Sequence, residues 1–358
     1  GINGFRIPGH IRSTFSLKFS QNPSPGDELT VFGNNEINKT YGFVNTPVGF
    51  SYGSDPISFE DDPSSATLSA GFQIVGGNAA MTLKQATACA VNLGSGNDLG
   101  SGTKHVISLG GFDGSDNRGE IRISDKIPYG CTITIEFWAT REDIIGGTFE
   151  TSESSTTDDL VLEYCSTSDF STATYTVNKR FEKSINNGGT YVSTTDSGAG
   201  RINGDDLPAD DSDTSNTATL TKFRINVTDM PVGGSYLRVR KLVSAIAGDS
   251  IIIYNFKYTL TEGSFGSPVP IRSSLSDTII ALNTELGKNP NIQHSSPVGS
   301  DVLEFRPYGD RVAIYDHGVY TTTSNVEITE SKGFSNSAND SWNGKYTSFV
   351  GGILTEEN

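Results

Sequence analysis

The stretch HVISLGGFDGSDNRGEIRISDKIPYGCTITIEFWAT, residues 105–140, decides the fold class. Its final part alternates polar and apolar residues, as in TITIEF (residues 132–137), and turn-forming residues interrupt the stretch before that run. Period-two alternation bounded by Gly, Asp, Asn or Pro is typical of half-buried antiparallel strands and not of helices. The same pattern returns in residues 158–170, 223–243 and 249–260. Together these runs predict a jelly-roll β-sandwich.

The composition limits the partners of the chain. Its 358 residues include 42 Asp and Glu against 26 Lys and Arg, which gives a net charge of −16. Such an acidic surface repels phosphate backbones, so we expect no nucleic-acid partner. No apolar run is long enough to cross a bilayer, so we also expect no membrane insertion. The 40 glycines fit short strands joined by many turns.

The three cysteines (Cys89, Cys131 and Cys165) form no CxxC pair that would indicate zinc. Cys131 and Cys165 lie beside or within strand patterns, so buried thiols are expected there. The odd number of cysteines favours assembly in a reducing cytoplasm.

The two ends of the chain predict a second, smaller domain. In residues 15–44 a Pro-Ser-Pro-Gly-Asp turn separates two strands, and a Gly-Asn-Asn turn leads to a third. Further on, Ser274 or Ser276 can cap a helix that Gly287 ends. One apolar face follows the helical period: Ile279, Leu282 and Leu286. This is the only helix that the sequence predicts.

These end segments resemble a small α+β module that recurs in structural proteins of tailed bacteriophages. The matching hairpin positions are Gly26, Asp27, Thr30, Val31, Gly33, Tyr41 and Phe43. The matching helix positions are Ser276, Asp277, Thr278, Leu282, Asn283, Asn289, Pro290 and Ile292. In that family the helix follows the hairpin after a few residues, whereas here the whole sandwich segment intervenes. The resemblance therefore implies that the jelly roll is inserted into the module.

We thus predict a mainly β protein, a jelly roll inserted into a small α+β domain with one clear helix. Residues 1–60 and 265–330 would form the discontinuous α+β domain that docks on the virion. Residues 61–264 would form the inserted jelly roll, and residues 331–358 a C-terminal arm or small β extension.

The inserted segment resembles the concanavalin-like sandwich of the MAM and reelin-repeat type. The strand order carries the resemblance, through Arg122 and Ile123, residues 133–137, residues 159–164 and residues 252–256. The disulfides of that family are missing here. Several of its members bind calcium or partner surfaces, so the resemblance implies decoration, attachment or glycan contact.

Two acidic segments are candidates for cation binding. The loop GFDGSDNRGE contains Asp113, Asp116 and Asn117, and Asp158 or Asp159 could approach it across the sandwich. Calcium needs six to eight oxygen ligands, and these side chains could supply some of them. The alternative is a solvated turn. Residues 200–217 carry five further aspartates, which predict a mobile surface loop or, alternatively, a cation cluster.

The function predicted first is that of a structural component of a tailed-phage virion, in the capsid decoration, neck, tail or fibre. It would act through contacts with other virion proteins and with its own copies. The alternative is a receptor- or glycan-binding module of a fibre or baseplate, with a host-surface glycan as partner. Ca²⁺ is the only cofactor that the sequence suggests.

A third hypothesis is a glycan-cleaving enzyme, which needs paired carboxylates. Glu136 and Glu163 lie in strand patterns and are its candidates, but strand glutamates mostly face solvent. We therefore predict no enzymatic activity. Trp138 and Trp342 could contact sugars, although Trp138 follows Phe137 in a strand, so one of those two faces the core.

Overall fold

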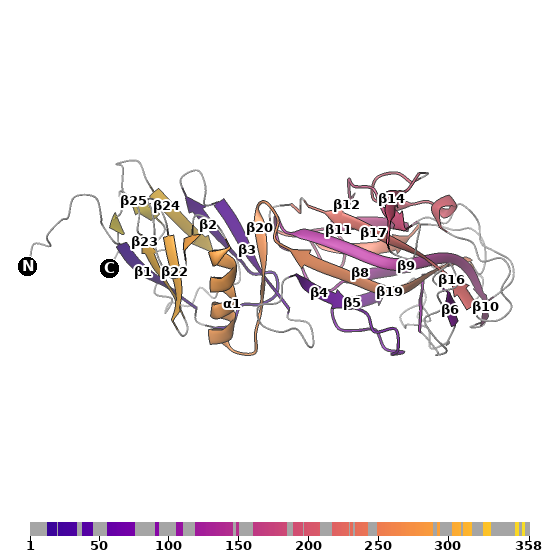
Figure 1. The fold of residues 1–358 in the computed structure, drawn as a ribbon, viewed down its shortest axis with the longest axis horizontal. Coiled ribbons are helices and arrows are strands. Elements are labelled where there is room, and N and C mark those ends of the chain that lie inside the picture. Colours follow the sequence, from indigo (N-terminus) through magenta and orange to yellow (C-terminus); the bar gives the residue numbers. More distant parts are fainter. Residues whose placement is uncertain are drawn as a thin grey trace, which may run out of the picture.

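The computed structural model describes residues 13–19, 21–33, 38–45, 56–75, 90–92, 105–109, 119–145, 148–149, 160–184, 189–195, 197–207, 217–228, 230–231, 233–242, 249–288, 292–293, 303–308, 311–316, 325–330, 348–350 and 353–354. Over these residues the protein is mainly β with a single α-helix, as predicted. The larger part is a β-sandwich, and a smaller α+β part adjoins one end of it (Figure 1).

Two antiparallel sheets form the sandwich, and we name each after a central strand. The β9 sheet has the order β14 (Tyr191–Ser193), β13 (Glu182–Ser184), β17 (Thr221–Val227), β9 (Thr132–Ile145), β19 (Asp249–Thr261) and β4 (Ile57–Glu60). Two short strands pair with it: β10 (Thr148–Phe149) with β9, and β7 (Ile107–Ser108) with β19. The β11 sheet has the order β12 (Thr174–Thr176), β11 (Leu160–Cys165), β18 (Tyr236–Lys241), β8 (Glu120–Ile123) and β5 (Phe72–Val75), and β15 (Arg201–Ile202) pairs with β11. A separate parallel pair joins β6 (Ala90–Asn92) to β16 (Thr217–Thr219).

The core of the sandwich lies between the two sheets, because the apolar positions of each alternating strand point inward. The β9 sheet contributes Ile133, Ile135, Phe137, Phe223 and Ile225, and the β11 sheet contributes Ile74, Ile121, Leu160, Leu162 and Val239. Aromatic rings interlock within it: Phe59 stacks on Tyr258 with centroids 4.6 Å apart, and Phe72 meets the same ring edge-on. Cys131 and Cys165 are buried free thiols, as predicted.

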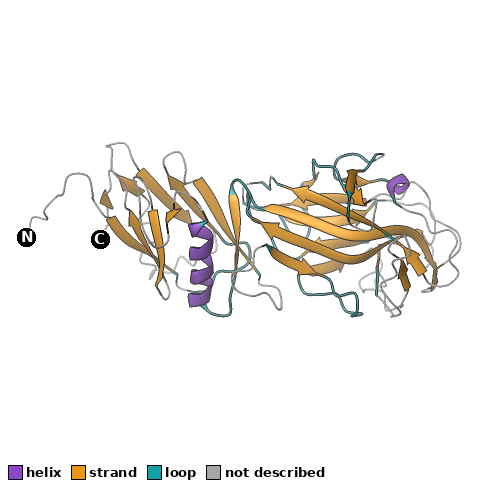
Figure 2. Ribbon diagram, viewed as in Figure 1, coloured by secondary structure: helices purple, strands orange, loops and turns teal. Residues whose placement is uncertain are grey.

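The α+β part contains two further sheets. One has the order β20 (Gly266–Pro270), β3 (Asn38–Val44), β2 (Glu28–Gly33), β24 (Asn325–Glu330), β25 (Ser348–Val350) and β26 (Ile353–Leu354). The other has the order β1 (Ser13–Lys18), β23 (Arg311–Asp316), β22 (Leu303–Tyr308) and β21 (Ile292–Gln293). Helix α1 (Leu275–Gly287) contacts β20 and β22 (Figure 2).

Helix α1 begins where its capping residue predicts. The Ser274 side chain accepts a hydrogen bond from the backbone N–H of Asp277 at 3.1 Å, which satisfies one of the donors left free at a helix start. The predicted apolar face is fully buried: Ile279, Leu282 and Leu286. No helix of the described residues is long and apolar enough to span a bilayer.

The chain leaves the α+β part at β3 and returns at β20, and these two strands pair in parallel. The strands of the sandwich lie between them in sequence. β4 pairs with β19 in the β9 sheet, so residues 57–60 lie in the sandwich although the sequence places the boundary at residue 60.

Glycines make the junction of the two parts tight. A Cβ atom at Gly42 in β3 would overlap the ring of Pro128, and one at Gly266 in β20 would overlap the carbonyl oxygen of Tyr129. Glycine is therefore required where the 127–131 segment of the sandwich meets this sheet.

Candidate functional site

The outer face of the β11 sheet carries a dense set of charged side chains. Strand alternation turns Ile121, Leu237 and Leu162 into the core, so their neighbours in sequence point outward. The strand register then aligns these outward side chains across the sheet in one row: Gln73, Arg122, Arg238, Glu163 and Thr176. The adjacent row contains Val75, Glu120, Arg240 and Val161.

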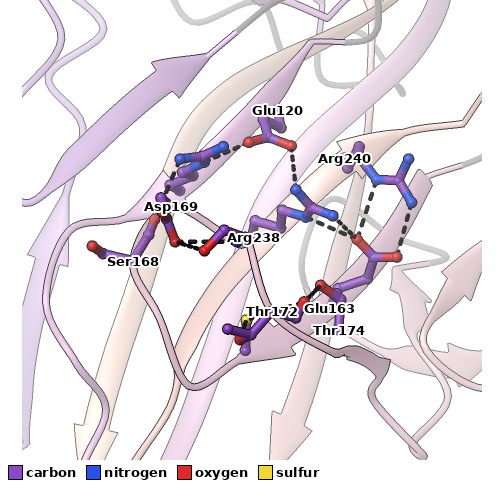
Figure 3. Close-up of polar contacts among 11 residues, drawn as sticks. Glu120, Glu163, Ser168, Asp169, Thr172, Thr174, Arg238 and Arg240 are labelled. Atoms are coloured by element: carbon purple, nitrogen blue, oxygen red, sulfur yellow. Dashed lines mark hydrogen bonds and ion pairs between the residues drawn. The ribbon is translucent and has the colours of Figure 1, made fainter.

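The charges of these rows form a connected network of ion pairs (Figure 3). Glu120 accepts from the Arg122 Nε and, at 2.9 Å, from the Arg238 Nη1. Glu163 accepts from the Arg238 Nε at 2.8 Å and from the Arg240 Nη2 at 2.9 Å. Glu120 and Glu163 are only 5% and 8% exposed, so these pairs are largely shielded from water. We call the five residues the outer-face network.

The network favours the ionised form of Glu163. Burial would raise the pKa of Glu163, but hydrogen bonds and charge from Arg240 and Arg238 outweigh it and lower the pKa below its ordinary value. Charged, multiply hydrogen-bonded pairs of this kind hold side chains in fixed positions. The network therefore makes a rigid floor on this face of the sandwich.

The loop after β11 folds back over the network. Phe170 places its ring on two guanidinium groups, with the Arg238 Cζ 4.4 Å and the Arg122 Cζ 5.3 Å from the ring centroid. Arg122 also donates to the carbonyl oxygen of Ser168 at 3.3 Å. Phe170 has a φ of 56°, which is unusual for a non-glycine residue. Cation–π stacking helps to hold the loop in this conformation.

Loop and sheet enclose an open polar hollow of about 350 Å³. Its lining combines floor residues of the sheet with wall residues of the loop: Gln73, Arg122, Ile123, Ser124, Ser168, Asp169 and Tyr236. The lining thus presents an amide, a guanidinium, hydroxyl groups, a carboxylate and a phenol ring on a surface that solvent reaches. We call this the β11-sheet hollow.

Asp169 is the acidic group of the hollow. The hydroxyl and the backbone N–H of Ser171 donate to its Oδ1 at 2.7 and 3.1 Å. These bonds, with one from the Thr167 side chain, lower the pKa of Asp169 to about 2. Asp169 is therefore a fixed negative charge at neutral pH.

Cys165 lies on the same face as Tyr236, its register partner in β18. Burial would raise the pKa of its thiol, but hydrogen bonds from Thr172 and Thr167 outweigh this and lower the pKa to about 7. The residue is only 1% exposed. Its contacts, such as the 3.1 Å hydrogen bond with the Thr172 hydroxyl, anchor the loop to the sheet.

The outer face of the β9 sheet is also charged, but its pairs are more exposed. Glu136 pairs with Lys222 at 3.1 Å, and Lys222 lies 6.0 Å from the ring centroid of Trp138. Arg224 stacks on Tyr191, with the Cζ 3.8 Å from the ring centroid. Trp138 lies on this outer face while Phe137 is in the core, which confirms the predicted division of the two rings.

The structure separates the two glutamates considered for catalysis. Glu136 lies on the outer face of the β9 sheet and Glu163 on the outer face of the β11 sheet, so the core lies between them. Each is ion-paired with basic neighbours. They do not form the carboxylate pair that the enzyme hypothesis requires.

The candidate calcium ligands Asp113, Asp116 and Asp159 lie outside the described residues, as does Trp342. Their proximity stays a prediction. Within the part of the chain that the structure describes, no group of three His, Cys, Asp or Glu side chains is placed to hold a metal ion.

Of the 200–217 segment, for which a mobile surface loop or a cation cluster is predicted, residues 208–216 lie outside the described residues, but one described aspartate is anchored. Asp206, in the 3₁₀ turn η2 (Gly204–Asp206), is only 4% exposed. It accepts from the Lys183 Nζ at 2.8 Å and from the Ser197 hydroxyl at 2.6 Å. Burial would raise its pKa, but these contacts outweigh that effect and lower it. The acidic composition does not reveal this anchor because its partners lie earlier in the chain.

The comparison with known proteins begins with two negative results. No protein-family model matches the chain, and no curated protein matches it.

Solved structures do match, at low identity. One is the CBM22-1 xylan-binding domain of Paenibacillus barcinonensis Xyn10C, with 11% identity over 57% of this chain and 95% of that chain and a TM-score of 0.27. Another is the K1 cleaved adhesin domain of Lys-gingipain from Porphyromonas gingivalis W83, with 9% identity over 58% and 99% and a TM-score of 0.28.

The enzymatically active domain of tailspike protein 4 from bacteriophage CBA120 also matches. Its identity is 19% over 53% of this chain but only 19% of that chain, with a TM-score of 0.24. The neighbours thus include carbohydrate-binding modules and a phage tailspike domain. At these TM-scores the matches assign no function to the chain.

Proposed function

We propose that this protein is a glycan-binding jelly roll carried on a tailed-phage particle. The β11-sheet hollow is the observation that carries the binding proposal. Sugars present hydroxyl groups in fixed directions together with apolar C–H faces. The amide of Gln73, the carboxylate of Asp169 and the ring of Tyr236 are complementary to both kinds of group.

The surroundings of the hollow support a binding role. Its floor is held by the outer-face network, and its wall is held by the stacking of Phe170 on Arg122 and Arg238. A site fixed before the ligand arrives loses little conformational entropy on binding. The unusual backbone conformation of Phe170 also lies beside the hollow, and such conformations concentrate at ligand sites.

We expect binding without cleavage. Glu120 and Glu163, the acids of the floor, are each held by two arginines. A general acid needs a raised pKa, whereas the pKa of Glu163 is lowered. Bound oligosaccharide should therefore keep its length on prolonged incubation, as measured by mass spectrometry.

A glycan array followed by calorimetry tests the binding proposal. Gln73→Ala removes an exposed amide of the hollow, and we expect roughly fivefold to tenfold weaker binding for one lost hydrogen bond. Asn226→Ala is the matched control, because Asn226 is an exposed residue on the outer face of the opposite sheet. No glycan bound by the wild type, or equal loss in both variants, would contradict the proposal.

The virion role rests on the resemblance of the hairpin and helix to the phage α+β module. In this proposal the α+β part docks on other virion proteins or on copies of this chain, and the sandwich projects from it. Figure 1 shows the α+β part toward one end of the molecule and the sandwich extending away from it, which suits such a division.

Sedimentation and negative-stain imaging of the purified protein test the virion role. We expect symmetric trimers, rings or lattices. A monomer at all concentrations, together with absence of the protein from purified phage particles, would contradict it. Repeating the sedimentation with calcium tests the Asp113, Asp116 and Asp159 prediction separately.

A further inference from the structure

On the basis of the proposed function, we infer that the β11-sheet hollow selects uncharged sugars over acidic ones, and that Asp169 is the residue that sets this selectivity. The inference names a ligand class for the site: neutral oligosaccharides, as opposed to those with carboxylate or sulfate groups. It rests on the distribution of charge around the hollow.

The arginine side chains near the hollow are largely engaged by other groups of the protein. Arg122, Arg238 and Arg240 pair with two carboxylates, those of Glu120 and Glu163. Of these arginines only Arg122 lines the hollow, and its side chain is 16% exposed. Its Nε donates to Glu120 and its Nη1 to the Ser168 carbonyl, so it has few N–H groups left to hold an arriving anion.

Asp169 is the opposite case. It is exposed on the wall, and the residues that donate to it, such as Ser171, are uncharged. Ser171 therefore orients the carboxylate without neutralising it. A carboxylate has room for more than two donors, so Asp169 can also accept the hydroxyl groups of a sugar. The same charge repels a carboxylate or sulfate on the ligand.

The long-range field acts in the same direction. The chain carries a net charge of −16, which disfavours the approach of any anion. Two unit charges about 4 Å apart in water repel enough to weaken binding roughly fivefold, and partial exclusion of water increases this factor. We therefore expect an acidic sugar to bind at least about fivefold more weakly than its neutral counterpart.

The test compares paired oligosaccharides that differ only in oxidation of C6 from hydroxymethyl to carboxylate. Their dissociation constants are measured by calorimetry on the wild-type protein and on Asp169→Asn, at low and at high salt. Asn keeps the shape of Asp and removes the charge. Glu60→Gln is the control, because Glu60 is an exposed acid of the β9 sheet.

We expect the wild type and Glu60→Gln to prefer the neutral sugar at least about fivefold, and Asp169→Asn to lose most of that preference. Tighter binding of the acidic sugar to the wild type would overturn the inference and leave the glycan-binding proposal standing. A preference that persists in folded Asp169→Asn would overturn the role of Asp169. Failure of the wild type to bind any oligosaccharide would instead overturn the proposed function itself.

Discussion

Replacing Glu163 by glutamine tests the role of the outer-face network. Glu163 is 8% exposed and receives N–H groups of both Arg238 and Arg240. Its Oε2 accepts from the Arg238 Nε, the Arg238 Nη2 and the Arg240 Nε, at 2.8, 2.8 and 3.1 Å, and its Oε1 accepts from the Arg240 Nη2 at 2.9 Å. A glutamine can keep its oxygen at the Oε2 position. Its NH₂ group then faces the Arg240 donor.

The loss of folding stability expected for Glu163→Gln follows from these contacts. Glu163→Gln removes the charge between two arginines, loses one hydrogen bond and creates one donor–donor contact. Removing one member of a well-buried ion pair costs about 3–5 kcal/mol, and a hydrogen bond to a charged group contributes about 1.5–3 kcal/mol. Because the arginines keep some access to water, we expect a loss of about 3 kcal/mol in the free energy of unfolding.

Urea denaturation at neutral pH measures this loss, with Glu136→Gln as the matched control. Glu136 is also a strand glutamate on an outer face, but its side chain is 23% exposed and pairs with Lys222. Exposed pairs contribute about 0–1 kcal/mol, so the control should lose less than about 1 kcal/mol. Similar losses in both variants would refute the claim that the network is shielded and strongly coupled.

The pH dependence adds a second check on Glu163→Gln. The folded-state pKa of Glu163 lies below its ordinary value of about 4.3, so its contribution to stability is present above that value and is lost as the pH falls through the folded-state pKa. The stability difference between wild type and variant should be constant from pH 8 to 6 and should shrink below about pH 4.3. A constant difference down to pH 2 would contradict the assigned cause.

Two further substitutions test the junction and the helix cap. Gly42→Ala forces a Cβ atom into the ring of Pro128 and should cost about 3 kcal/mol or more, whereas Gly198→Ala, which has nothing within 4 Å, should change the free energy of unfolding by less than about 0.5 kcal/mol. Equal melting curves for the two variants would argue against the tight junction. Ser274→Ala should cost about 1 kcal/mol through loss of the helix cap, and Ser276→Ala, at an exposed position of the same helix, should be close to neutral in urea denaturation. The reverse order would place the cap at Ser276.

Sequence alone predicts those strands and the helix that depend on residue patterns within the segment itself. The alternation in residues 132–137 is sufficient for a strand, and a serine cap at position 274 or 276 with the period of Ile279 and Leu282 is sufficient for a helix. The mainly β class with one helix is accordingly confirmed. Trp138 shows the same principle, because alternation alone requires it to face away from Phe137.

The hollow could not be predicted, because its residues meet only through the strand order. Gln73, Arg122 and Tyr236 come from β5, β8 and β18, which are neighbours in the sheet but not consecutive in the chain. Alternation indicates that each side chain points outward. It does not indicate which strands pair or in which register. Asp169 adds a loop whose position depends on contacts with Arg122 and Arg238 through Phe170.

Glu136 and Glu163 show how far environment separates two similar sequence positions. Both occupy outward positions of alternating strands, yet Glu163 lies in a shielded network and Glu136 in a more exposed pair. The difference arises from neighbours such as Phe170, which covers Arg238, one of the two arginines that hold Glu163. Nothing local in the sequence distinguishes the two glutamates, so sequence alone ranks them as equal candidates for catalysis.

The two parts of the functional proposal, glycan binding and display on a particle, are linked by the affinity expected of the hollow. Of the two charged residues that line the hollow, Arg122 belongs to the internally paired network, so few groups remain for a ligand, chiefly those of Gln73, Asp169 and Tyr236. A small, open and polar site of this kind gives weak binding per copy, because each hydrogen bond gained with the sugar replaces one with water. Copies repeated by symmetry on a particle would raise the effective concentration of each site for a glycan surface by orders of magnitude. Multivalent display is therefore the condition under which this hollow would hold a host surface.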